Sequence, residues 1–138
     1  MDTEDQLKDR RRLERYIISE SLIKVMNNTK WEKLRTLMLE ETERKPVWRV
    51  RCLRDKREVE PQWDGDWYYH LPEYKYIEWL EIYPINKEHR GHVLPDKVTD
   101  NTEYFISLLK SNCIPFSIEG ESLRVWGYQW PNQEIEFV

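Results

Sequence analysis

Residues 76–83 read YIEWLEIY, and this stretch decides the fold. Aromatic and β-branched residues dominate it, as they do in strands, and Pro84 ends it. Its apolar side chains fall on both faces, with Ile77 and Trp79 on one and Leu80 on the other. The pattern predicts a central strand that is covered, at least in part, on both sides.

Further strand patterns surround this one. Residues 47–54 (VWRVRCLR) alternate apolar and basic side chains. Residues 114–119 and 123–126 predict a hairpin around the turn Gly120–Glu121, and residues 135–138 offer an edge strand. We therefore expect the central strand to have neighbours on both sides.

The strand over residues 47–54 carries two arginines, Arg49 and Arg51, with Arg54 beside them. Such side chains either bind a phosphate or carboxylate ligand or pair across the sheet with Glu78 and Glu81. The second arrangement needs no ligand.

Helical patterns fill the remaining long segments. Apolar spacing predicts one helix over residues 3–26, a second that begins at Thr29 and a third that begins at Thr99–Asp100. We expect an α+β fold with N-terminal helices packed on a mostly antiparallel sheet of about four to five strands, and a further helix between the second and third strands.

The domain organisation follows from these segments. We assign residues 1–27 to an N-terminal helix and residues 28–138 to a single α+β domain. Two connections are predicted to be irregular, residues 55–75 and residues 85–98, and long loops of the first kind often carry function.

Charge is distributed unevenly along the chain. The net charge is −4, but residues 1–57 hold 16 Lys and Arg against 11 Asp and Glu, whereas residues 58–138 hold 6 against 15. An acidic part of this kind repels a phosphate backbone and attracts a basic partner. The composition therefore favours a protein partner and opposes nucleic acid.

Several classes of function lack their motifs. The four glycines are scattered and form no phosphate-binding loop, and no nucleophile motif is present. Cys52 and Cys113 are expected to be reduced and buried, without a zinc site. No secretion signal or membrane-spanning run is found, so we expect a cytoplasmic protein that binds no membrane and needs no cofactor or metal.

The loop over residues 62–74 gathers aromatic and acidic side chains. Tryptophan and tyrosine dominate contact sites, and carboxylates around them select a partner by charge. The candidate partner-binding residues are Trp63, Asp64, Asp66, Trp67, Tyr69 and Glu73. In the alternative, Trp63 and Trp67 fold back over the sheet as a lid on the core.

Two other functions compete with partner binding. A metal-assisted hydrolase would use Asp64, Asp66, Glu78 and Glu81, with His70 nearby, as metal ligands or as acid and base. Against it, Glu78 and Glu81 are predicted to point to opposite faces of their strand. A self-associating structural protein would use an exposed strand or the aromatic loop as its interface.

The run Arg10–Arg12 suggests contact with nucleic acid. A solvated helical face explains it more simply, because Asp9 and Glu14 interrupt the basic charge. The net charge of −4 along the whole chain favours this simpler interpretation.

Four segments carry a resemblance to a family. They read NTKW at residues 28–31, VRCL at residues 50–53, YIEWLEI at residues 76–82, and IPF at residues 114–116 followed by VWGY at 125–128. Together they resemble an uncharacterised bacterial family of small, Trp-rich cytoplasmic proteins, a domain of unknown function. The resemblance implies no activity or cofactor.

Size, acidity and composition are also similar to those of immunity proteins of polymorphic toxin systems, which block a toxin domain that is often basic. We therefore expect a non-catalytic protein-binding module, an immunity protein whose acidic, aromatic surface neutralises a basic toxin domain. Its oligomeric state is left open.

Overall fold

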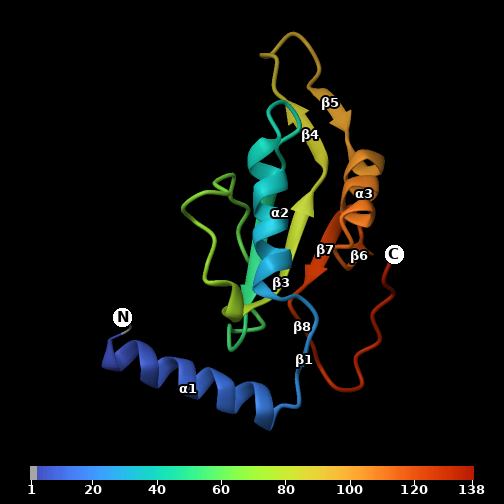
Figure 1. Cartoon of the computed structure of the whole chain (residues 1–138). Coiled ribbons are helices and arrows are strands. Elements are labelled where there is room, and N and C mark those ends of the chain that lie inside the picture. The colour runs from blue at the N-terminus through green and yellow to red at the C-terminus, as the bar shows by residue number, and fades with distance from the viewer. Residues whose placement is uncertain (1–2) are drawn as a thin grey trace.

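The computed structural model describes residues 3–138 and is built around one antiparallel sheet. Its four strands lie in the order β2 (Val47–Cys52), β3 (Ile77–Tyr83), β7 (Ser122–Trp126) and β6 (Phe116–Glu119). Figure 1 shows the helices arranged around this sheet. The predicted α+β fold in a single domain is confirmed.

Strand β3 lies at the centre, as its sequence predicts. It pairs antiparallel with β2 on one side and with β7 on the other, and only its last residue, Tyr83, is not fully buried. The face formed by Leu80 and Ile82 belongs to the main core. The opposite face carries Trp79 and Glu81, both buried although no helix packs there.

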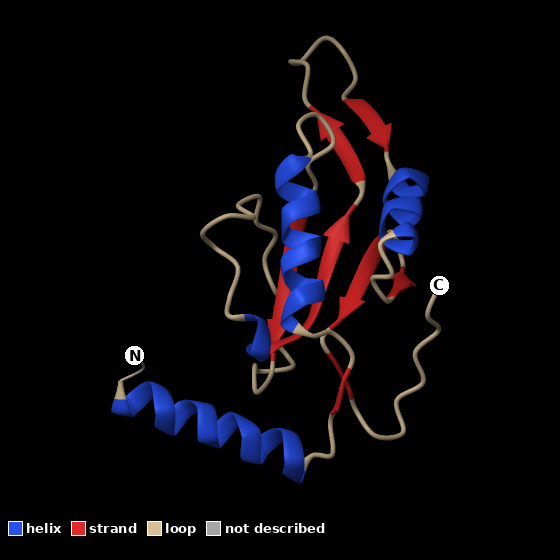
Figure 2. Ribbon diagram, viewed as in Figure 1, coloured by secondary structure: helices blue, strands red, loops and turns tan. Residues whose placement is uncertain are grey.

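Two helices cover the same face of the sheet. Helix α2 (Asn28–Glu40) contributes Trp31, Leu34 and Met38 to the core, and helix α3 (Thr102–Ser111) contributes Phe105 and Leu109. The Asn27 side chain caps helix α2 by accepting a hydrogen bond from the backbone N–H of Lys30. The helix therefore begins at Asn28, one residue before the predicted start at Thr29. Figure 2 shows both helices running beside the strands.

Helix α1 (Glu4–Ser19) is shorter than the predicted helix over residues 3–26. Ser21 has φ of 56°, a left-handed conformation that ends the helix. The chain then forms β1 (Ile23–Lys24), which pairs with β8 (Tyr128–Gln129). The prediction was wrong here because Ile23 pairs with a segment more than a hundred residues away.

Helix α1 contacts the domain through a small second cluster. Leu13 packs there with Leu22, Leu53 and Tyr128. Figure 1 shows α1 below the sheet, and Asp9 adds polar contacts to Tyr76 and Arg54.

Residues 85–98 were predicted to be irregular, and this prediction was wrong. They belong to a hairpin of β4 (Ile85–Glu88) and β5 (Lys97–Asp100). Their polar composition gives no alternating pattern, because all strand residues but Ile85 are exposed. Residues 74–76 form a short 3-10 turn, η1 (Tyr74–Tyr76), that leads into β3.

The edges of the main sheet are each met by one further segment. Trp48 of β2 forms an isolated bridge with Asp64, and Ser117 of β6 forms one with Phe137. The predicted edge strand over residues 135–138 is thus reduced to this single bridge. At the first edge, the bridge fixes the position of the aromatic–acidic loop.

Both cysteines are free thiols, as predicted, but neither is fully buried, because Cys52 is half-buried and Cys113 is exposed. It follows α3 with φ of 56°, at a position where the chain turns away from the helix. Among residues 3–138, the structure contains no helix with the length and apolar character that crossing a bilayer requires.

Candidate functional site

The loop over residues 62–74 is attached to the edge of the sheet. Asp64 and Trp48 exchange two backbone hydrogen bonds of 2.8 and 2.7 Å, as neighbouring strands do. The indole N–H of Trp48 also donates to the carbonyl of Asp66 at 3.3 Å. The middle of the loop is therefore held by β2 rather than suspended in solvent.

Trp67 anchors the loop in the core. Its side chain is 2 % exposed, and its indole N–H donates to the carbonyl of Pro46 at 2.9 Å. For this residue the alternative holds: the ring covers the sheet and is not presented to a partner. The predicted partner-binding role of Trp67 as a surface ring is corrected accordingly.

Helix α2 holds the loop from the other side. The guanidinium of Arg35 donates to the carbonyls of Trp67 and Tyr68, both at 2.9 Å. The same group lies over the Tyr68 ring, 5.0 Å from its centre. Backbone and ring are thus fixed by a single side chain, which the sequence analysis did not identify.

The two loop aspartates lie together with His70. The His70 ring contacts Asp64 Oδ2 at 2.9 Å through Nδ1 and Asp66 Oδ2 at 3.6 Å through Nε2. Asp66 Oδ1 accepts backbone hydrogen bonds from Tyr68 and Tyr69, each 2.8 Å. Asp64 Oδ1 likewise accepts from the backbone N–H of Asp66 at 2.7 Å, so both aspartates stabilise the turn of their own loop.

Hydrogen bonds keep both carboxyl groups ionised. The pKa of Asp64 is lowered, first by the backbone N–H of Asp66 and then by His70. The pKa of Asp66 is lowered, first by the backbone N–H of Tyr69 and then by that of Tyr68. Donors to a carboxylate stabilise its charged form. The loop therefore carries fixed negative charge at neutral pH.

The exposed rings of the loop lie on two faces of the molecule. Tyr69 is 79 % exposed and stacks edge-on against Tyr68, beside α2. Trp63, 41 % exposed, lies over Arg49 and against Tyr83. Arg49 is paired with Glu81 on the sheet face without helices. Trp63 therefore lies on the side of β2 that carries Arg49, whereas the two tyrosines lie on the side of α2.

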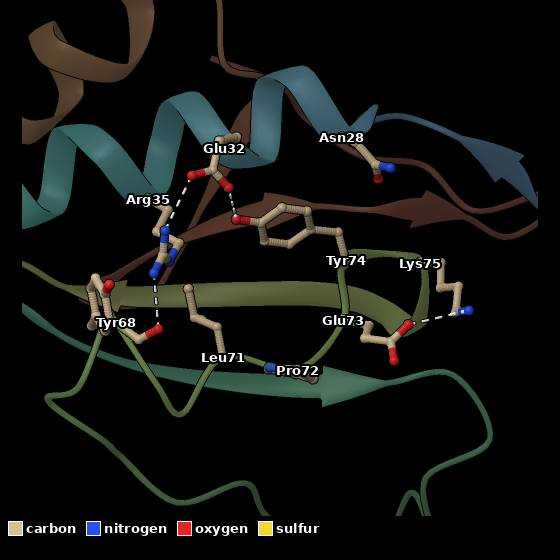
Figure 3. A pocket seen from close by; sticks show the side chains of 9 residues that line it. All are labelled: Asn28, Glu32, Arg35, Tyr68, Leu71, Pro72, Glu73, Tyr74 and Lys75. Carbon is tan, nitrogen blue, oxygen red and sulfur yellow. Dashed lines mark hydrogen bonds and ion pairs between the residues drawn. The ribbon is translucent and has the colours of Figure 1, made fainter. Parts of the chain in front are cut away.

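Glu73 lies at a pocket between α2 and the end of the loop. Figure 3 shows this pocket, of about 450 Å³, with Glu32 and Arg35 on the helix side and Tyr74 across from them. Glu73 forms an ion pair with Lys75 at 3.2 Å. The predicted candidate Glu73 is therefore near the helix side of the loop, apart from the aspartates.

A hydrogen bond from the hydroxyl of Tyr74 to Glu32 closes one side of this pocket. It lowers the pKa of Glu32, with help from Arg35. Burial, followed by the hydrogen bond to Glu32 and then by the charge of Glu32, raises the pKa of Tyr74 to about 12. In the sequence, Glu32 fits only a capping pattern that begins at Thr29. No pattern there indicates its hydrogen bond with Tyr74.

The matched family adds to this geometry. A family model described as a family of unknown function, DUF6678, matches residues 13–132. The chain belongs to this family. The predicted membership of an uncharacterised family is confirmed, and the match is wider than the four segments that carried the resemblance.

The DUF6678 match includes the whole sheet, both covering helices and the loop over residues 62–74. Its description assigns no activity, so the likeness to immunity proteins stays a prediction. Comparison with the curated proteins and with the solved structures found no match.

The four carboxylates of the hydrolase alternative occupy separate places in the DUF6678 fold. Glu81 is buried between Arg49 and Arg124, at 2.6 and 2.9 Å. Glu78 is buried and accepts from Arg57 at 2.7 Å and from the indole of Trp130 at 2.7 Å. Both carboxylates are thus buried and held by arginines, of which Arg57 is itself mostly exposed.

Asp64 and Asp66 lie on the loop with His70, away from these two pairs. Over residues 3–138, no group of three or more His, Cys, Asp or Glu side chains is placed to hold a metal ion. The predicted pairing of Arg49 with Glu81 is correct, whereas Glu78 pairs with Arg57 of the long connection.

Proposed function

We propose that this DUF6678 protein is a non-catalytic binding protein whose contact surface is the loop over residues 62–74. The observation that carries the proposal is the anchoring of this loop by β2, Trp67 and Arg35. An anchored loop loses little conformational freedom when a partner binds, so more of the contact energy appears as affinity.

The chemistry of the surface supports a basic partner. Asp64 and Asp66 carry negative charge at neutral pH, their hydrogen bonds lower their pKa further, and Tyr69 stands exposed next to them. Aromatic anchors with a charged rim are typical of interface hot spots. Carboxylates steer the approach of a cationic partner and suppress wrong ones.

The finer proposal is an immunity protein, which acts in the cytoplasm and covers the basic cleft of a toxin domain. It is supported by the small size, by the excess of acidic over basic residues after residue 57, and by the fixed loop. In this arrangement the loop carboxylates would occupy the positions of an anionic substrate and exclude it.

Growth rescue tests the proposal. The protein encoded by the gene directly upstream of the gene for this chain would be expressed in a bacterial host, alone and together with the chain. We expect it to stop growth alone and the chain to restore growth. For a triple variant with D64N, D66N and Y69A, the amount of protein needed to restore growth should rise at least tenfold. Each Asn keeps the side-chain oxygen that accepts the hydrogen bonds of the loop, so the loop should keep its shape.

A matched variant controls for general effects of charge and area. E88Q, D96N and V93A neutralise two carboxylates and shorten one exposed apolar side chain on the β4–β5 hairpin, where Asp96 contacts His89 as Asp64 contacts His70. It should protect like the unchanged chain. Equal protection by both variants would show that the loop is not the contact surface. If the protein of the neighbouring gene does not stop growth, the immunity role is refuted.

A further inference from the structure

The outward side of α1 carries a stripe of four basic side chains. Lys8, Arg11, Arg12 and Arg15 follow the spacing of one helix face, and all four are exposed. Lys8 pairs with Glu4 at 4.0 Å, whereas Arg11, Arg12 and Arg15 form no ion pair within residues 3–138. We refer to these four residues as the basic stripe.

The acidic residue that breaks the basic run in the sequence does not lie on the stripe. Asp9 is turned toward the domain, where it accepts from the hydroxyl of Tyr76 and pairs with Arg54 at 3.7 Å. Asp5 and Gln6 line a pocket on the same inner side. Folding thus turns Asp9 away from the outer face, and the exposed carboxylates near the stripe are Glu4, which pairs with Lys8, and Glu14.

The apolar side of α1 is not available to a membrane. Leu13 is buried, and Tyr16 and Ile17 pack in the same cluster against the domain. A helix that binds a bilayer surface needs its apolar face for the lipid. What α1 presents outward is therefore mainly charge, accompanied by the exposed Leu7 and Ile18 near its two ends.

We propose that the basic stripe of α1 binds the phosphate backbone of a nucleic acid without reading its sequence. Guanidinium groups match phosphate geometry with paired donors. The seven helical steps from Lys8 to Arg15 span about 10 Å, a length along which a duplex carries about six phosphate charges. Four cations at this spacing suit contact with several phosphates at once.

This site is separate from the proposed contact loop and lies largely outside the family match. Three of the four residues, Lys8, Arg11 and Arg12, precede residue 13, where the family match begins. The expectation that nucleic acid is repelled came from charge summed along the chain. The structure instead places four exposed basic side chains on one helix face.

Binding of the full chain to a labelled duplex DNA, followed by fluorescence anisotropy at several salt concentrations, tests the proposal. We expect binding at low salt that weakens with a log–log slope no steeper than about −3.6, the value for four phosphate contacts. A variant with K8Q, R11Q, R12Q and R15Q should bind at least tenfold more weakly. Gln keeps helix propensity close to that of Lys and Arg, so α1 should persist, which circular dichroism checks.

The matched control replaces four exposed lysines elsewhere, K24Q, K33Q, K45Q and K110Q, with the same change in net charge. It should bind within about twofold of the unchanged chain. Equal losses in both variants, or no binding at low salt, would overturn the proposal. Stripe-dependent binding to vesicles of anionic lipid without binding to the duplex would also overturn it, in favour of a membrane surface.

Discussion

At the scale of single residues, the two tryptophans of the loop have different tasks. Trp67 is buried and donates a hydrogen bond to Pro46, whereas Trp63 stays 41 % exposed over Arg49. Trp67→Phe should lower the free energy of unfolding by about 1–3 kcal/mol, since the Pro46 carbonyl loses its partner and the core loses volume. Trp63→Phe should cost less than about 1 kcal/mol. Urea denaturation would measure both, and equal costs would contradict the assignment.

Glu81 gives a second prediction at this scale. It is 1 % exposed and pairs with Arg49 and Arg124, whose side chains are 24 % and 23 % exposed. Glu81→Gln should cost about 2 kcal/mol, less than a fully buried pair, because solvent screens the two guanidinium groups. Glu60→Gln is the control, because Glu60 meets the same Arg49 while 81 % exposed. Its cost should stay below about 0.5 kcal/mol, and a reversed order in chemical denaturation would refute this account.

Cys52 links stability to alkaline pH. Burial, with the charges of Asp55 and Glu78, raises the pKa of its thiol from 9.0 to about 11. The folded state therefore holds this proton more tightly than the unfolded state. The stabilisation is complete below pH 9 and is lost as the pH rises from 9 to 11.

Cys52→Ala should accordingly remove part of the decline in unfolding free energy over that interval. The comparison with the unchanged chain separates this contribution from those of the tyrosines. Parallel stability curves for the two proteins between pH 9 and 11 would show that the thiol does not titrate there.

At the scale of elements, α1 and the main core are held by different clusters. Leu13 is the one fully buried residue of α1 and contacts Leu22, Leu53 and Tyr128. Leu13→Ala should release the helix locally, at a cost of about 2–4 kcal/mol for its docking. Amide hydrogen exchange should then accelerate over residues 4–19 while β3 stays protected. Uniform acceleration in both elements would show that α1 is part of the main cooperative unit.

The elements also show how far sequence patterns reach. The central strand is identifiable because its apolar residues are continuous and Pro84 ends it. The end of α1 is not identifiable from the sequence, because Ile23 and Met26 continue the helical spacing of apolar residues. In the structure, Ile23 pairs with Gln129 of a distant strand and Met26 packs in the main core. The β4–β5 hairpin is also hidden, since its exposed strands need no alternation.

The candidate site was predictable to a similar degree. The turn residues Asp64 and Asp66 are neighbours in sequence, so their convergence follows from local geometry. The burial of Trp67 depends on Pro46 and Arg35, which approach it from other elements. No pattern within residues 62–74 could show which of the two tryptophans faces solvent.

At the scale of the whole molecule, charge is sorted onto separate surfaces. The loop over residues 62–74 presents ionised carboxylates at the edge of the sheet, and the basic stripe lies on the outer side of α1. The sheet face without helices is neutralised internally, with Glu81 between two arginines. Opposite charges on distinct surfaces allow two partners of different chemistry to be selected independently.

The affinity of the neighbouring gene's protein for the loop tests the central claim most directly. Titration calorimetry would compare the unchanged chain, the D64N, D66N and Y69A variant, and the E88Q, D96N and V93A control, each shown to be folded. We predict a loss of at least tenfold in affinity for the loop variant only, because it removes two fixed charges and one exposed anchor. The same affinity for all three proteins would contradict the claim that this loop is the contact surface.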